Sequence, residues 1–219
     1  MATLRVPPIH LISRELLGTF LMNGRQRTSA LKIGWVAAFL GAFGFCLAEP
    51  AHAESVIQRY ETATPASGIK AGGARVQVHA PIEVVERVIM DYGSWSQHIR
   101  KFEKAKVVGR RGDRTHVYLQ VPILKGATRI WVVAEFDPIK RTDAGDVIVA
   151  RMLKGNVKRL DARWKLSKVD DQNTKVELEL LLVPDWPLPV PNSLVTEEAT
   201  NAAEQAIDGL RKAAERAGG

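Results

Sequence analysis

The sequence predicts an α+β domain in which a curved antiparallel sheet of about seven strands wraps around a long C-terminal helix. Apolar and polar residues alternate with a period of two along most of residues 102–182, which is typical of half-buried antiparallel strands. An alanine-rich segment, roughly residues 192–216, then repeats small apolar residues at helical spacing. The domain is expected to span residues 74–216, and the residues ahead of it have the composition of an export leader.

Residues 1–53 have the order of a secretory leader. Basic residues precede an apolar run of 15 residues, 33–47, and a small-x-small site follows that ends at Ala53. The run is shorter than the roughly 20 residues that a membrane-spanning helix needs. We therefore expect a cleaved signal peptide and a periplasmic or secreted protein, with a retained N-terminal anchor as the alternative. Met22 would head a leader of more ordinary length and is a candidate for the true start.

Cysteine and charge limit what the mature chain can do. The one cysteine of the full sequence, Cys46, lies in the predicted leader. The mature domain is therefore expected to have no disulfide, thiol nucleophile or cysteine-bound metal. Outside the leader 26 basic and 22 acidic residues remain, a net charge of +4. Some cations cluster in the sequence: Arg100, Lys101, Lys104, Lys106, Arg110, Arg111, Lys154, Lys158 and Arg159. They indicate either transient contact with an anionic membrane surface or an ordinary solvated face, and we expect no nucleic-acid partner.

Turn and helix signals predict the first elements of the domain. Residues 54–73 are polar and end in two glycines, so they are expected to form a linker or a loose edge segment. Residues 75–79 form a short strand. Pro81 suits the first turn of a helix over residues 82–91, and a second short helix is expected over residues 95–99.

Six strands are expected to follow the two short helices. Each is an alternating or short apolar run bounded by turn residues such as glycine, proline, aspartate or asparagine. They cover residues 102–108, 117–123, 130–136, 147–153, 160–166 and 176–182. Most of these strands have one apolar face and one polar face, which predicts a sheet with a core side and a wet side.

The last predicted helix has a buried face made largely of alanine. Its apolar positions are Val195, Ala199, Ala202, Ala203, Ala206, Leu210 and Ala213. Small side chains let a helix lie close to a sheet, and they also leave room for a ligand where a curved sheet bends away. The sequence leaves both interpretations open.

We predict that a hydrophobic ligand is held between the sheet and this helix. The predicted lining combines inward-facing strand positions with the small-residue face of the helix. It consists of Leu119, Val121, Val132, Ala134, Trp164, Leu178, Leu180, Ala199, Ala203, Ala206 and Leu210. Burying about 15 methylenes is worth on the order of 12 kcal/mol before ordering and association costs, so no charged anchor is required.

Four segments of the domain together form a recognisable pattern. In residues 76–95 an alanine–proline pair leads into a helix that ends in Asp-Tyr and is followed by an aromatic residue. Residues 164–166, 174–176 and 184–189 add two late strands and a proline-rich loop before the last helix. This pattern resembles the START / Bet v 1-like (SRPBCC) helix-grip superfamily, and most of all its polyketide cyclase/dehydrase and coenzyme-Q-binding START group. The resemblance covers roughly residues 69–216 and implies a helix-grip fold with a lipid-, quinone- or polyketide-like ligand.

Signals of catalysis are sparse in the mature chain. It has no nucleophile elbow and no phosphate-binding loop, and its histidines lie far apart in the sequence, so we assign no catalytic residue, metal or cofactor. Four polar residues could face the cavity and polarise a substrate as cyclase-type members need: Tyr118, Arg129, Arg151 and His98. His98 could also meet Asp91 as an acid–base couple, although helix capping and solvent exposure are the simpler roles.

The sequence therefore predicts a monomeric periplasmic binding or carrier protein for a hydrophobic small molecule. A cyclase/dehydratase-type enzyme using the same cavity is one alternative, and a non-catalytic envelope interaction module is another. Trp186, in a proline-rich loop, is predicted either to touch the membrane surface or to pack over the end of the last helix.

The leader gives the first testable prediction. If the site ending at Ala53 is cut, the exported protein begins at Glu54, and N-terminal sequencing will read that residue first. An exported chain that keeps residues 33–47 would contradict cleavage. Substituting the codon for Met22 tests the start site separately, because expression should cease if translation begins there.

Overall fold

The computed structural model describes residues 55–65, 68–185 and 190–219. The predicted leader, Met22 and Trp186 lie outside these residues. None of the helices formed by the described residues is long and apolar enough to cross a membrane.

The described residues form one antiparallel sheet with three α-helices and two short 3-10 turns. Eight strands lie in the spatial order β1-β2-β8-β7-β6-β5-β4-β3. The elements are β1 (Gln58–Thr62), β2 (Ala71–Val78), α1 (Ile82–Met90), η1 (Tyr92–Ser94), α2 (Trp95–His98), β3 (Lys104–Arg111), β4 (Arg114–Ile123), η2 (Leu124–Gly126), β5 (Thr128–Phe136), β6 (Asp146–Gly155), β7 (Val157–Lys168), β8 (Thr174–Pro184) and α3 (Asn192–Gly218). The α+β helix-grip fold predicted from the sequence is therefore confirmed.

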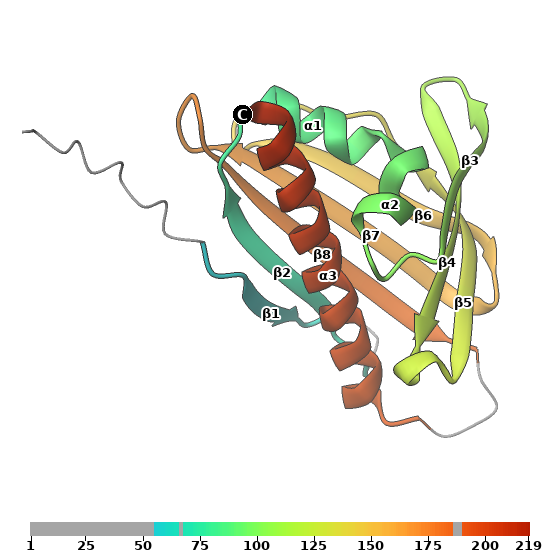
Figure 1. Ribbon diagram of the computed structural model, residues 1–219. Helices are drawn as coiled ribbons and strands as arrows, with labels where there is room; N and C mark the ends of the chain where they lie inside the picture. The colour runs from blue at the N-terminus through green and yellow to red at the C-terminus, as the bar shows by residue number, and fades with distance from the viewer. Residues whose placement is uncertain (1–54, 66–67, 186–189) are drawn as a thin grey trace, which may run out of the picture. The chain divides into compact units, whose positions relative to one another are not determined.

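Strand β1, the one strand of the described residues that was not predicted from the sequence, lies in the segment expected to be a linker or a loose edge. It pairs with β2 along one border of the sheet (Figure 1). The glycines that suggested a turn, Gly72 and Gly73, lie inside β2, which starts at Ala71. A Cβ on Gly73 would overlap the ring of Tyr60 on β1, so this glycine makes room for a cross-strand aromatic side chain.

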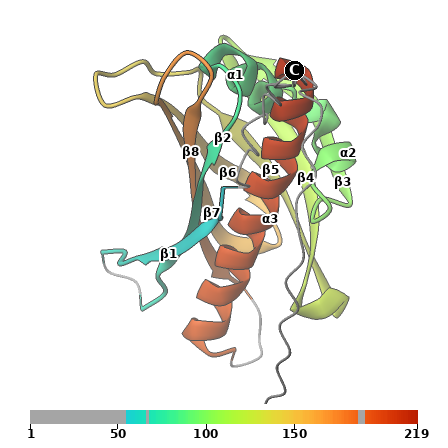
Figure 2. The same ribbon diagram turned by 60° about the vertical axis from the view of Figure 1, so that its left-hand side comes forward.

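Helix α3 lies along one face of the sheet, with β1 and β2 on one side and β3–β5 on the other (Figures 1 and 2). Helices α1 and α2 pack beside the C-terminal half of α3. The strands turn alternate residues toward this helical layer: on β5, Ile130 and Val132 are buried while Arg129 and Trp131 are exposed on the opposite face. The core thus lies between the sheet and the helices.

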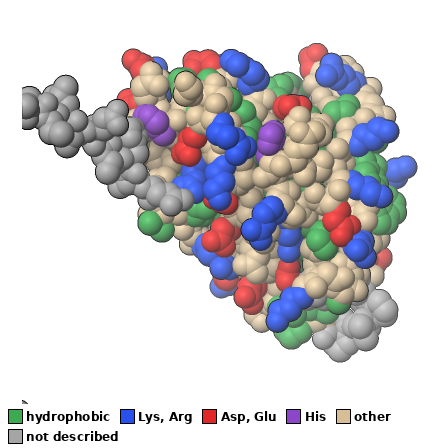
Figure 3. All heavy atoms as spheres, in the orientation of Figure 1, with side chains coloured by type: hydrophobic (Ala, Val, Ile, Leu, Met, Phe, Trp, Pro, Cys, Tyr) green, Lys and Arg blue, Asp and Glu red, His purple; other side chains and the backbone are tan. Residues whose placement is uncertain are grey.

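Charged side chains lie on the outer face of the sheet and along the β3 edge, as well as on the solvent side of α3. Lys and Arg side chains recur along the right-hand edge in Figure 3, where β3 lies. Part of the basic cluster predicted from the sequence is on this strand: Lys104, Lys106, Arg110 and Arg111. Charged side chains on an open edge discourage pairing with a strand of another molecule, which gives this part of the cluster a structural role.

Two glycines bring α3 unusually close to its neighbours. A Cβ on Gly72 would overlap Thr200 of α3 and lie 2.8 Å from the carbonyl oxygen of Thr196. A Cβ on Gly209 would overlap the carbonyl group of His98 at the end of α2. The backbone of α3 therefore rests directly on β2 and α2, and Ala203, between these glycine contacts in the sequence of α3, has no exposed surface.

This close packing predicts the effect of a single methyl group. We expect Gly72→Ala to destabilise the domain by about 1–3 kcal/mol, because the Cβ must push α3 away from β2. Urea unfolding followed by circular dichroism measures the change. Gly93→Ala is the matched control, since its Cβ would meet no atom nearer than 3.9 Å. Equal stabilities for the two variants would contradict the packing argument.

Candidate ligand-binding cavity

An apolar cavity of about 90 Å³ lies between the sheet and α3. Nine of the eleven residues predicted to line a ligand site form part of its wall: Leu119, Val121, Val132, Ala134, Trp164, Leu178, Leu180, Ala199 and Ala206. The other two, Ala203 and Leu210, are buried in the core outside this wall. Ala203 lies where α3 packs tightly, which the helical spacing alone did not distinguish from the cavity side.

The alanines of α3 serve both of the purposes that the sequence left open. Ala199, Ala202 and Ala206 face the cavity, so their small side chains leave space. Ala203 is packed in the core, where a larger residue would separate the helix from its neighbours. One helix therefore combines close packing with a hollow on an adjoining side.

Aromatic side chains fill much of the room around the cavity. Trp95 stacks on Phe102 with ring centroids 5.5 Å apart and lies 6.2 Å from Trp164, and all three residues line the wall. The indole N–H of Trp95 donates to the backbone oxygen of Ile89 at 3.0 Å, so this polar atom is satisfied away from the cavity. These rings are the reason that the space is small.

The four polar residues predicted as possible cavity groups do not line this cavity. Arg129 points outward from β5 and donates to both carboxylate oxygens of Glu103, at 2.8 and 3.1 Å. Tyr118 stacks on Trp131 on the outer face of the sheet. His98 ends α2, and neither it nor Asp91 contributes to the wall. Arg129 and Tyr118 lie outside because strand residues alternate between the two faces of a sheet, and both occupy the outward-facing positions.

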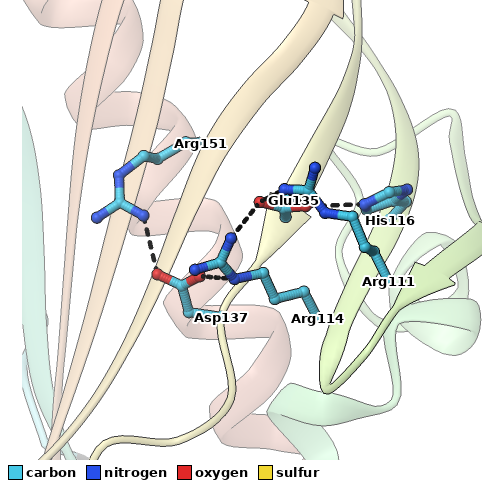
Figure 4. Close-up of polar contacts among 6 residues, drawn as sticks. All are labelled: Arg111, Arg114, His116, Glu135, Asp137 and Arg151. Carbon is cyan, nitrogen blue, oxygen red and sulfur yellow. Dashed lines mark hydrogen bonds and ion pairs between the residues drawn. The ribbon is translucent and has the colours of Figure 1, made fainter.

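The fourth residue, Arg151, belongs to a polar cluster on the outer face (Figure 4). Arg151 Nη1 donates to Asp137 at 2.8 Å, and Arg114 joins Asp137 to Glu135. Glu135 also forms an ion pair with Arg111, and it accepts a hydrogen bond from His116 at 2.9 Å. That bond from His116, followed by the guanidinium charges, holds the pKa of Glu135 below its usual range. The cluster ties β3–β6 together on the side away from the ligand cavity.

Sequence reasoning missed the two charged residues that do line the cavity, Lys101 and Glu198. Lys101 Nζ donates to Glu198 Oε2 at 3.3 Å. One signal was available for Glu198, which lies at a spacing of four residues from Ala202 and then Ala206 and so shares their helix face. Lys101 had no such signal, because it lies in the irregular connection between α2 and β3.

Metal binding has no support in the described part of the chain. No group of three or more His, Cys, Asp or Glu side chains there is arranged to hold an ion.

The sequence of this domain matches a known protein family. The family described as "Polyketide cyclase / dehydrase and lipid transport" matches residues 73–215. The chain belongs to this family. The SRPBCC/START-like resemblance inferred from the sequence is thereby confirmed, and the family binds hydrophobic small molecules, as carriers or as cyclases.

Solved structures of polyketide cyclase and START-like proteins resemble this member in fold. A STAR-related lipid transfer protein from Xanthomonas axonopodis is 14% identical, with a TM-score of 0.62 over 72% of this chain and 93% of that chain. A START superfamily protein from Mycobacterium smegmatis is 18% identical, with a TM-score of 0.56 over 66% and 97%. The di-domain ARO/CYC StfQ of the steffimycin biosynthetic pathway is 18% identical, with a TM-score of 0.51 over 66% and 44%. A search of the curated proteins found no match.

The aromatic residues near the cavity predict how stability responds to alkaline pH. Tyr92 packs against Phe136 and Trp95, and burial raises the pKa of Tyr92 to about 12. A tyrosine in the unfolded chain has a pKa of about 10. The stability associated with the neutral hydroxyl is therefore complete below about pH 10 and is lost as the pH rises through about 12.

Tyr92→Phe isolates this effect, because it keeps the packed ring and removes the ionisable group. We expect the variant to lose less stability than the wild type above about pH 10 in urea unfolding experiments. Tyr60, whose pKa burial also raises to about 12, is present in both proteins and cancels in the comparison. Parallel losses in the two proteins would exclude a contribution from Tyr92.

Proposed function

We propose that this protein is an exported binding or carrier protein for a hydrophobic small molecule with an extended apolar portion, held between the sheet and α3. The observation that carries the proposal is the wall of the cavity, in which 20 of 22 lining residues are hydrophobic. A dry apolar enclosure favours apolar ligands through the area it removes from water and needs no catalytic group. Membership of a family that includes lipid transport supports the same conclusion, and the leader pattern supports export.

The size of the cavity indicates that it must open to receive such a ligand. Its volume of about 90 Å³ is well below the roughly 300–1,000 Å³ of pockets that enclose drug-sized ligands. Gly72 and Gly209 hold α3 against β2 and α2, so expansion there would break close backbone contacts. In the connection between α2 and β3, Ile99 shares the close contact with Gly209. Lys101 and Phe102, which this connection carries into the wall, are not among the nearest atoms to either glycine.

Burial of a chain-like ligand can offset the free energy that opening the cavity costs. Each buried methylene contributes about 0.8 kcal/mol, so about ten of them give on the order of 8 kcal/mol before association costs of several kcal/mol. Displacing Phe102 from Trp95 gives up one aromatic contact of about 0.5–1.5 kcal/mol. The remaining free energy supports useful binding without a covalent or metal-based anchor.

The most direct test is to identify what the protein carries. Protein purified from the cell envelope is extracted with organic solvent, and the extract is analysed by mass spectrometry. The proposal expects an amphiphilic or apolar compound in stoichiometric amount. Protein that carries nothing, and that also fails to bind a pyrene-labelled long-chain alcohol in a fluorescence titration, would contradict it.

Filling the cavity predicts a loss of binding. Ala199→Leu places a larger side chain into the space beside α3, and we expect it to weaken binding of the pyrene-labelled alcohol by about tenfold or more. Ala217→Leu is the control, because Ala217 is exposed on the same helix and does not line the cavity. Equal affinities of the two variants would place the ligand elsewhere on the protein.

A further inference from the structure

The two charged side chains of the cavity wall, Lys101 and Glu198, form an ion pair with each other. Lys101 belongs to the connection between α2 and β3, whereas Glu198 lies in the second turn of α3. Their side chains are 15% and 14% exposed, so each reaches both the apolar interior and the solvent. The ion pair therefore lies where the cavity meets water and links two segments that are far apart in the sequence.

This ion pair differs from the others that join described residues. In those pairs at least one side chain is more than one-fifth exposed, as in Lys70–Glu61, whereas both members of Lys101–Glu198 are nearly covered. An exposed ion pair changes the free energy of folding little. A covered ion pair must offset the free energy lost when two charges leave water. Two apolar residues would close an apolar wall at lower cost, which indicates that these charges serve recognition rather than packing.

The donor groups of Lys101 exceed what Glu198 uses. An ammonium group carries three N–H donors, and Glu198 accepts one of them at the rather long distance of 3.3 Å. The remaining donors suit the oxygens of a bound molecule. A carboxylate or phosphate on Lys101 would form charge-assisted hydrogen bonds, which are about twice as strong as neutral ones.

The surroundings favour an anion at this position. Arg100 and Lys104 are exposed in or next to the same connection, while the charge of Glu103 is taken up by Arg129. On α3, the neighbouring Glu197 is exposed and does not line the cavity. Among the described residues of the wall, Glu198 is the one carboxylate. The loop side of the opening thus has an excess of positive charge that attracts anionic groups.

We propose that Lys101 binds the anionic head group, a carboxylate or a phosphate, of a single-chain amphiphile whose chain enters the cavity. In the unliganded protein Glu198 provides the carboxylate that this head group replaces. Exchange of one anion for another keeps Lys101 paired, and release of Glu198 frees the connection that must move to admit the chain. This inference rests on the proposed function, because it names the class of ligand for the same cavity.

The test compares three pyrene-labelled ligands that share one chain and differ in the head group: a carboxylate, a phosphate monoester and a neutral alcohol. We expect the wild type to bind at least one of the two anions about 10- to 100-fold more tightly than the alcohol, since hydrogen bonds to charged groups are the stronger ones. Added salt should reduce this preference and leave alcohol binding nearly unchanged. The ratio of the two anion affinities distinguishes a fatty-acid-like from a phospholipid-like head group.

Variants assign the preference to the ion pair. The double variant Lys101→Met with Glu198→Gln removes both charges without leaving one unpaired, and it should bind all three ligands with similar affinity. Lys154→Met removes an exposed cation of β6 that does not line the cavity, and it should keep the preference of the wild type. Near-ultraviolet circular dichroism checks the packing of each variant.

The outcomes separate this inference from the function on which it rests. Equal affinity of the wild type for all three ligands, or a preference that survives in the double variant, overturns the role of Lys101 while alcohol binding still supports a hydrophobic carrier. Failure of the wild type to bind any of the three overturns both. If the double variant does not fold, the head-group comparison and its salt dependence in the wild type decide the question.

Discussion

The close approach of α3 to β2 is the constraint on which the rest of the domain depends. It requires Gly72 on the strand and small residues on the helix, because any Cβ at Gly72 would collide with the helix backbone. Once the helix rests on β2 and against α2, the sheet beyond β8 curves away from it, and the side chains there do not fill the whole space. The cavity is thus a consequence of tight packing on one side of the same helix.

The wall of this cavity explains why a ligand-binding protein can lack recognisable catalytic motifs. Its hydrophobic lining provides affinity through burial, which is non-directional and leaves no catalytic pattern in the sequence. Specificity then falls to the few polar groups that interrupt the lining. In the described residues these are Lys101 and Glu198, one from an irregular loop and one from a helix dominated by alanine.

The charged residues of the outer face have a different physical role. Glu135 and Asp137 are each shared by more than one cation, and the resulting network joins four adjacent strands on the side opposite the helices. Arg129 is likewise engaged with Glu103 outside the cavity. Because neighbouring strand residues point to opposite faces, an error of one position in assigning the phase of a strand exchanges a cavity residue for a surface residue. That is why Tyr118, Arg129 and Arg151 lie outside the cavity, while most of the predicted apolar strand residues lie in its wall.

The sequence by itself determined the order of the main elements from β2 to α3, the antiparallel sheet and the apolar face of the last helix, since period-two and helical patterns are local consequences of burial. For the same reason, nine of the eleven residues predicted to line a ligand site lie in the cavity wall. Only the tertiary structure decided that Gly72 and Gly73 lie within a strand rather than a turn, since the contacts that require them come from α3 and from Tyr60. It alone also brought Lys101 to Glu198, because a contact between residues almost a hundred positions apart leaves no local pattern in the chain.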